Sequence, residues 1–181
     1  HTDFLSFYAG ARLVGSEHLY SLNEVSALQK DFRALNEIKA FIRPPFYAIL
    51  LWPLGRLPFR TAELIWQALL LGFTAGFIAL WATGPLGVLM CCWFVPLWVS
   101  LIVGQDMPLM LFLAGLSTLL VRKGRPFWAG LVIALCIAKF HLLLLLPLLI
   151  IAKRFWRFAG GFVSGAAILA ALSFASQGWD W

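Results

Sequence analysis

Two ionisable side chains interrupt the most apolar stretch of this sequence. Residues 131–151 read LVIALCIAKFHLLLLLPLLII, and Lys139 and His141 are the polar residues in that stretch. A charge at the centre of a membrane helix costs about 2.5–3.5 kcal/mol on insertion scales, so such residues tend to face a wet cavity or a partner. Lys139 and His141 therefore either belong to a functional site or lie in a short loop at headgroup depth, where their side chains snorkel to water.

The composition is that of a membrane protein. Hydrophobic residues make up 62% of the 181 residues and charged residues 12%, against roughly 25% charged residues in an average soluble domain. We therefore predict an all-α, polytopic integral membrane protein. The net charge of +6 comes largely from short turns between apolar segments, which indicates orientation in the membrane rather than nucleic-acid binding.

Cysteine and acidic residues give no sign of a metal centre. Cys91, Cys92 and Cys136 all lie in apolar segments, without CxxC or Cys/His spacing. We expect a reaction without metal or cofactor.

The chain divides into a polar part and an apolar part. Residues 1–43 hold five acidic residues and predict a first extracytoplasmic loop with two juxtamembrane helices, over 4–14 and about 21–38. Residues 44–181 predict a single transmembrane bundle. The chain starts with His1, and we expect it to be a piece of a longer protein, truncated at both ends. The expected apolar segments are 46–54, 61–82, 86–103, 108–121, 127–138, 142–152 and 158–175.

The topology depends on two of these segments. Segment 46–54 is too short to cross unless it tilts and continues to Leu57, and Pro96 lies in the middle of segment 86–103. We predict that segment 46–54 crosses and that segment 86–103 is a re-entrant hairpin, because this places the basic residues of all short turns on the cytoplasmic side. Those residues are Arg56, Arg60, Arg122, Lys123, Arg125, Lys153, Arg154 and Arg157. The polar residues that then share the extracytoplasmic side are Asp3, Arg43, Gln105, Asp106, Lys139 and His141.

A set of short motifs has a familiar order and spacing. It comprises Asp3-Phe4, Phe7-Tyr8, Ala11, Leu19-Tyr20, Pro44-Pro45-Phe46, Pro53-Leu54, Gly104-Gln105, Arg125, Ala129-Gly130 and Ala138-Lys139. This pattern resembles glycosyltransferase family 87, the DUF2029 proteins, which are polyprenyl-phosphate-mannose-dependent, α-mannosyltransferase-like enzymes of the GT-C fold. The chain departs from the family pattern at Arg43, where an aromatic residue is common, at Asp106 in place of Asn, and at Phe140 in place of Pro.

The resemblance implies a multi-pass enzyme of the bacterial inner (plasma) membrane with its active site on the extracytoplasmic side. The donor would be a polyprenyl-phosphate sugar, with mannose as the expected sugar, and the acceptor a lipid or an envelope glycan. A carboxylate at the start of the first loop is the catalytic base of such enzymes, and Asp3 occupies that place. The alternative for Asp3 is an N-cap before Phe4.

The chemistry assigns expected roles to the other polar residues. Lys139 and Arg43 would hold the donor phosphate, although Arg43 would equally suit a lipid headgroup. His141 would donate to a phosphate or sugar oxygen, or pack. Gln105 and Asp106 would bind sugar hydroxyls, or cap the helix that begins near Pro108.

Tyr8 is the remaining candidate for contact with the sugar or acceptor, and packing or an interfacial position is the alternative role for its ring.

Two other function classes fit the composition. A lipid or sugar transporter or flippase would also use broken helices and polar residues at membrane depth, but it predicts an internal repeat, which the sequence lacks. A non-catalytic subunit of an envelope-assembly complex would tolerate the loss of Asp3.

Overall fold

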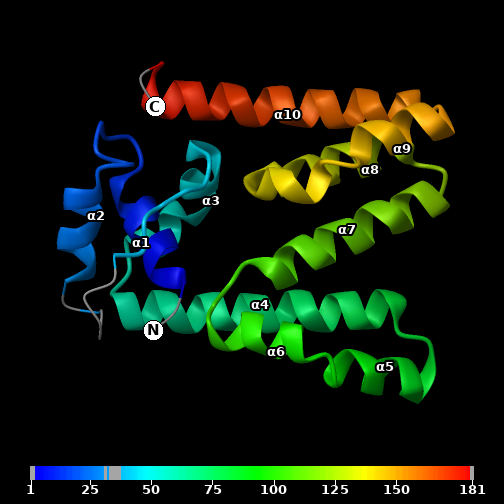
Figure 1. Cartoon of the computed structure of the whole chain (residues 1–181), viewed down its shortest axis with the longest axis horizontal. Coiled ribbons are helices and arrows are strands. Elements are labelled where there is room, and N and C mark those ends of the chain that lie inside the picture. Colours follow the sequence, from blue (N-terminus) through cyan, green and yellow to red (C-terminus); the bar gives the residue numbers. More distant parts are fainter. Residues whose placement is uncertain (1–2, 31, 33–37, 180–181) are drawn as a thin grey trace.

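The structure is a computed structural model that describes residues 3–30, 32 and 38–179, and every regular element in these ranges is helical (Figure 1). The helices are α1 Phe4–Leu13, α2 Leu22–Gln29, α3 Pro45–Gly55, α4 Phe59–Trp81, α5 Gly84–Cys92, α6 Val95–Ile102, α7 Met107–Arg122, α8 Pro126–Ala134, the 3-10 helix η1 Leu135–Leu143, α9 Leu146–Lys153 and α10 Trp156–Gln177. The predicted all-α class is confirmed.

The polar first part carries two short helices, as the sequence predicts. Ser21 caps α2 by accepting a hydrogen bond from the backbone N–H of Glu24 at 3.5 Å. The second helix was expected to reach Ile38, but α2 ends at Gln29, and residues 31 and 33–37 lie outside the described ranges. The division of the chain at residue 43 stays a prediction, and the buried core is continuous from α1 into α3, α4 and α10.

Three helical segments are long and apolar enough to cross a membrane. They are Phe59–Trp81, Pro126–Leu143 and Trp156–Gln177, and the bent pair α5 and α6 brings the number of candidate spans to four. The protein is therefore a multi-pass integral membrane protein, in agreement with its composition.

The predicted interruption near Pro96 is present, but the chain direction after it differs from the prediction. Pro96 lies in the first turn of α6, where its missing N–H is tolerated. The pair α5 and α6 is bent by 51°, which is far from a reversal. Figure 1 shows the two helices in succession along α4, and the indole nitrogen of Trp66, early in α4, donates to the carbonyl of Gly104 just after α6 (2.9 Å). The chain has thus returned to the end where α4 began.

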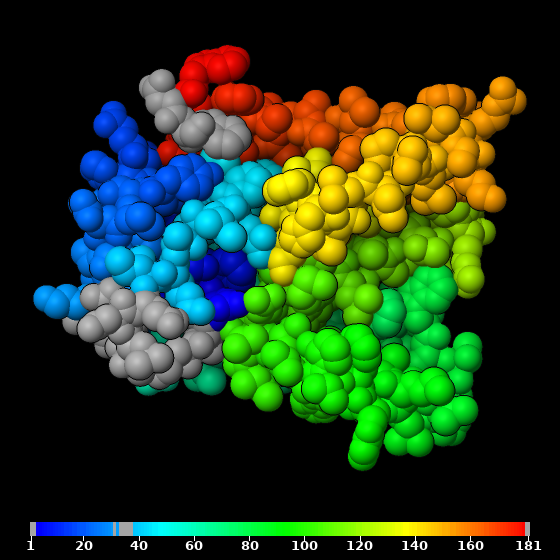
Figure 2. Space-filling model, in the orientation of Figure 1, coloured from blue at the N-terminus to red at the C-terminus, as the bar shows by residue number. Residues whose placement is uncertain are grey.

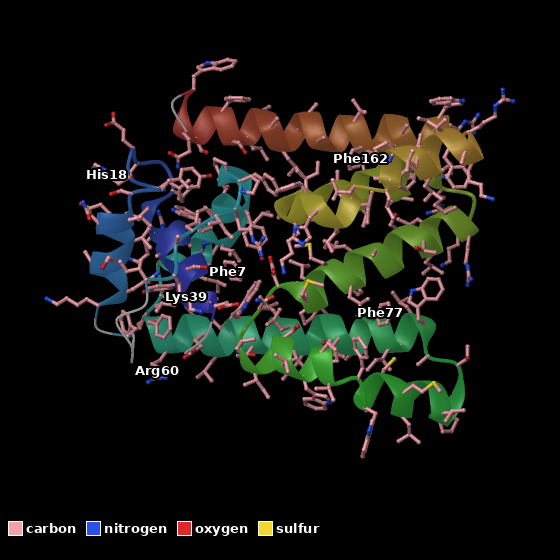
Figure 3. The ribbon with its side chains drawn as sticks, viewed as in Figure 1. Phe7, His18, Lys39, Arg60, Phe77 and Phe162 are labelled. Atoms are coloured by element: carbon pink, nitrogen blue, oxygen red, sulfur yellow. The ribbon has the colours of Figure 1, made fainter. Side chains whose placement is uncertain are left out.

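Helix α3 also takes a different course from the prediction. It packs against α1 and α10 at one end of the bundle instead of continuing to the other end (Figure 1). Arg60, at the start of α4, lies at that same end (Figure 3). Arg122 at the end of α7 instead stacks on Trp81, the last residue of α4, at 4.7 Å from the ring centroid. The physical reason is length. The eleven residues of α3 are too few to span a bilayer, but they can bury their apolar side chains against neighbouring helices. Because both segments differ from the predicted course, residues 103–106 and 139–141 still lie at the same end of the bundle as Asp3, as the sequence predicts.

Helices α8 and α10 approach closely through glycine. A Cβ added at Gly161 would collide with the carbonyl of Phe127, and one added at Gly130 would collide with the carbonyl of Phe158. Small residues at such a contact let two membrane helices approach closely. The contact fixes α8, and with it the η1 segment that carries Lys139.

A methyl group at Gly161 should separate these helices. We expect Gly161→Ala to destabilise the protein by about 1–3 kcal/mol, the usual range for overpacking a dense contact, and to lower the melting temperature of the detergent-solubilised protein. Gly160→Ala is the matched control, since a Cβ there meets nothing within 4 Å. Equal melting temperatures for the two variants would contradict this account of the α8–α10 contact.

Candidate active site

Four breaks in regular structure meet at one end of the bundle. They are the start of α1, the segment before α3, the turn from α6 to α7, and η1, in which Lys139 has non-helical φ and ψ of −124° and 67°. Figure 2 shows a hollow at this place, with atoms of α1 at its bottom between the segment before α3, η1 and the start of α7. Irregular backbone at membrane depth is tolerated where it is buried in protein or lines a cavity.

A buried carboxylate joins three of the breaks. Asp106 is fully buried, and its Oδ1 accepts from Lys139 Nζ at 2.7 Å and from Arg43 Nη2 at 3.1 Å. Arg43 Nη1 also donates to the carbonyl of Ala138 (3.3 Å), next to Lys139. A buried carboxylate without a cation would be strongly destabilising. The two cations are therefore held in place by Asp106, and the three side chains together carry one net positive charge.

The turn at Gly104 explains how neighbouring residues serve different partners. Gly104 has φ +69°, a conformation that favours glycine, and the indole of Trp66 holds its carbonyl. After this turn Asp106 meets the two cations, while the Nε2 of Gln105 donates to Oδ2 of Asp3 at 2.6 Å. Asp106 stands at the N-cap position of α7 without a side-chain capping bond.

Asp3 lines a smaller cavity of about 320 Å³, together with Lys39, Arg43 and Gln105 among others. Its carboxylate accepts from Gln105 and pairs with Lys39 Nζ at 3.2 Å, and its side chain is 25% exposed. Asp3 occupies the N-cap position of α1 but makes no side-chain capping bond, so its carboxylate oxygens face the cavity partners. Lys39 is not among the residues predicted from the sequence, because nothing in its flanking residues distinguishes it from other cations of the polar region.

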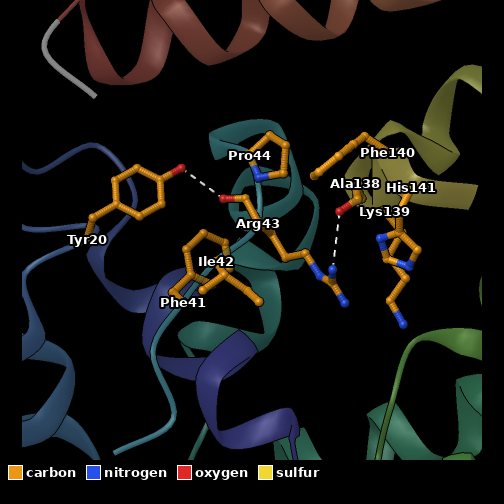
Figure 4. A pocket seen from close by; sticks show the side chains of 9 residues that line it. All are labelled: Tyr20, Phe41, Ile42, Arg43, Pro44, Ala138, Lys139, Phe140 and His141. Atoms are coloured by element: carbon orange, nitrogen blue, oxygen red, sulfur yellow. Dashed lines mark hydrogen bonds between the residues drawn. The ribbon is translucent and has the colours of Figure 1, made fainter. Parts of the chain in front are cut away.

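A larger cavity of about 610 Å³ shares Ile42 and Arg43 with the smaller one (Figure 4). Its lining includes Tyr20, Arg43, Lys139 and His141, and Arg43 belongs to both cavities. Figure 4 shows the Arg43 and Lys139 side chains extending in the same direction, with the His141 ring beside Lys139. The hydroxyl of Tyr20 donates to the carbonyl of Arg43 at 2.8 Å, and burial raises the pKa of Tyr20 to about 12, so it remains a donor at neutral pH.

The structure thus brings six of the seven predicted site residues to one place. They are Asp3, Arg43, Gln105, Asp106, Lys139 and His141. Tyr8 is not among them, since its buried hydroxyl donates to the carbonyl of Leu57 at 2.8 Å and its ring packs on Phe59. Asp106 is present but is too buried to touch a sugar, which differs from the role expected of it.

Within the described residues no three His, Cys, Asp or Glu side chains form a group that could hold a metal ion. The charged groups that line the two cavities are one carboxylate, from Asp3, and the cations of Lys39, Arg43 and Lys139. This set can bind a phosphate and take up a proton.

The fold is a multi-pass helical membrane bundle, and its site combines an acid group with a cationic pocket at one end. Membrane transferases are one class of protein with these features. The sequence matches Glycosyltransferase family 87 over residues 41–181, and the chain belongs to this family. The matched range includes Arg43, Gln105, Asp106, Lys139 and His141, whereas Asp3 and Lys39 precede it. No curated protein and no solved structure matches the chain.

The hydrogen bond from Trp66 to Gly104 should support the turn that carries Gln105 and Asp106. Trp66→Phe removes the donor and keeps most of the ring contacts with Phe4 and Phe7. The expected loss is about 1 kcal/mol, which corresponds to a fall in melting temperature of about 2–4 °C for a chain of this size. Trp93→Phe is the control, because Trp93 is 86% exposed. An unchanged melting temperature for Trp66→Phe would contradict the supporting role.

Proposed function

We propose that this membrane glycosyltransferase moves a sugar, with mannose as the expected one, from a polyprenyl-phosphate donor to a lipid or envelope glycan acceptor. The observation that carries the proposal is the pair of neighbouring cavities that share Arg43, one lined by the Asp3 carboxylate and the other by Lys139. Sugar transfer from a lipid phosphate needs a base at the acceptor hydroxyl and cations at the leaving phosphate, and these are the groups on the two sides of Arg43.

The proposed reaction is a displacement at the anomeric carbon. The acceptor hydroxyl oxygen forms a bond with the anomeric carbon while the bond between that carbon and the phosphate oxygen breaks. The electron pair of the broken bond stays on the phosphate oxygen. Asp3 takes the proton of the acceptor hydroxyl, with its carboxylate oriented by Gln105 and Lys39. Arg43 and Lys139 stabilise the negative charge that develops on the phosphate, and His141 lies within the same cavity.

We place the donor phosphate in the larger cavity and the acceptor hydroxyl in the smaller one. Guanidinium and ammonium groups are the usual protein partners of phosphate, and both line the larger cavity. The acceptor hydroxyl must approach Asp3, which lines the smaller cavity. The sugar would then pass beside Arg43 from the donor phosphate in the larger cavity to the acceptor hydroxyl in the smaller one.

The charge distribution supports an extracytoplasmic site. The turns at the opposite end of the bundle carry six basic residues and no acidic residue: Arg122, Lys123, Arg125, Lys153, Arg154 and Arg157. Short basic turns favour the cytoplasmic side. Arg56 and Arg60 lie at the site end, contrary to the predicted distribution, so the support for this orientation comes from the short basic turns that carry no acidic residue.

Asp3→Asn should abolish most of the transfer. Removing a positioned base lowers the rate by about 10²–10⁴-fold, while the amide keeps the shape of the side chain and leaves the larger cavity intact. The assay follows labelled sugar from a polyprenyl-phosphate donor in membranes that hold the full-length enzyme, together with donor binding. Glu24→Gln is the control, an exposed carboxylate in α2. Normal turnover by Asp3→Asn would refute the base assignment, and lipid movement without sugar transfer by the wild type would favour a flippase.

Lys139→Ala should impair use of the donor. We expect kcat/KM for the donor to fall by about 10²-fold or more, as for the loss of one charge-stabilising group at a transition state. Lys153→Ala, which changes an exposed lysine at the other end of the bundle, should leave kcat/KM unchanged. An unchanged rate for Lys139→Ala at every donor concentration would remove Lys139 from the mechanism.

A further inference from the structure

The three side chains Arg43, Asp106 and Lys139 form a group with a defined charge, which we call the cradle. Both cations share one oxygen of Asp106, at 3.1 and 2.7 Å. Asp106 is fully buried, so its charge is neither exposed to solvent nor in contact with a ligand in the cavity. The carboxylate cancels one of the two cations, and the cradle presents one net positive charge to the larger cavity.

The neighbouring charges do not alter this count at pH 8. Asp3 and Lys39 form a neutral pair of their own. The charge on the phosphate side of Arg43 is therefore set by whether a carboxylate stands at position 106.

Donor and product differ in charge under the proposed function, on which the following inference rests. A polyprenyl-phosphate sugar is a phosphodiester with one negative charge. The polyprenyl monophosphate that leaves is a monoester, which carries two negative charges above its second pKa of about 6. A cation therefore attracts the product about twice as strongly as it attracts the donor.

We propose that Asp106 sets the charge of the cradle so that it matches the donor diester and does not retain the product monoester. With two uncompensated cations the cradle would bind the doubly charged product more tightly and slow its release. With one net positive charge, the cradle neutralises the single negative charge of the donor. It neutralises only one of the two negative charges of the product. Asp106 is thus a specificity-determining residue that acts through Arg43 and Lys139 and does not itself touch the substrate.

Two features make Asp106→Asn an informative change. The amide is close in shape to the carboxylate, and Oδ1 can still accept from both cations. A further buried polar neighbour of Asp106 is the hydroxyl of Tyr47, which can accept a hydrogen bond from the amide nitrogen placed at Oδ2. The main effect of the substitution is one additional net positive charge.

The experiment measures the binding of two probes at pH 8 to the full-length protein in detergent. One probe is polyprenyl monophosphate, and the other is polyprenyl methyl phosphate, an unreactive diester. The quantity of interest is the ratio of the monoester affinity to the diester affinity. We expect Asp106→Asn to raise this ratio at least about tenfold, the effect of one more charge pair at the effective dielectric of a partly buried site. Product inhibition by polyprenyl monophosphate should increase in parallel.

Three further variants vary the charge in defined steps. Lys139→Gln removes one positive charge and should lower the ratio by about tenfold. The double variant Asp106→Asn with Lys139→Gln restores one net charge and should restore the wild-type ratio. Asp106→Glu keeps the charge and should keep the ratio, although the longer side chain shifts the two cations.

The outcomes separate this inference from the proposed function. An unchanged ratio in Asp106→Asn, with both probes still bound, would overturn the charge-matching role and leave the donor site in place. Failure of the wild type to bind either probe would overturn the donor site itself. If Asp106→Asn does not fold, Lys139→Gln decides, and a ratio equal to the wild-type value in that variant would overturn the inference.

Discussion

The buried carboxylate of Asp106 is the constraint on which the rest of the site depends. A charge at zero exposure is tolerated only when cations reach it, and here one comes from the segment before α3 and one from the break in η1. Their positions are consequently fixed relative to α7, whose first turn follows Asp106. The ion pairs of Asp106 connect the segments at this end of the bundle. They also hold Arg43 and Lys139 in the lining of the larger cavity.

The helices that hold this interaction are ordered by close packing rather than by polar contacts. α8 and α10 meet at glycines, and α1 lies against α3 and α4 through stacked aromatic rings such as Phe4 on Trp66. These dense contacts fix the positions of the helices that flank the irregular segments at the site end. The bend of 51° between α5 and α6 has a similar result, since it brings Gly104 back to α4.

Adjacent residues divide the site into two parts. Gln105 contacts Asp3 and Asp106 contacts Lys139, so a single turn of chain holds both the acid group and the Lys139 cation. Ile42 and Arg43 line both cavities, so the two cavities adjoin each other at these residues. Family membership establishes a glycosyltransferase, and this two-part arrangement is the feature from which we infer how donor and acceptor are held apart and then brought together.

Much of this protein was determined by the sequence alone. Its apolar composition predicted the all-α membrane class, the prolines predicted helix breaks, and the predicted sidedness of the turns grouped six polar residues that the structure brings together. The tertiary structure decided the rest. The path of α3 and of α5 with α6 depends on which neighbour buries each apolar face, and the ion pairs of Lys39 and Asp106 join residues far apart in the chain. Such pairings follow from the complete packing of the helices, which local periodicity does not encode.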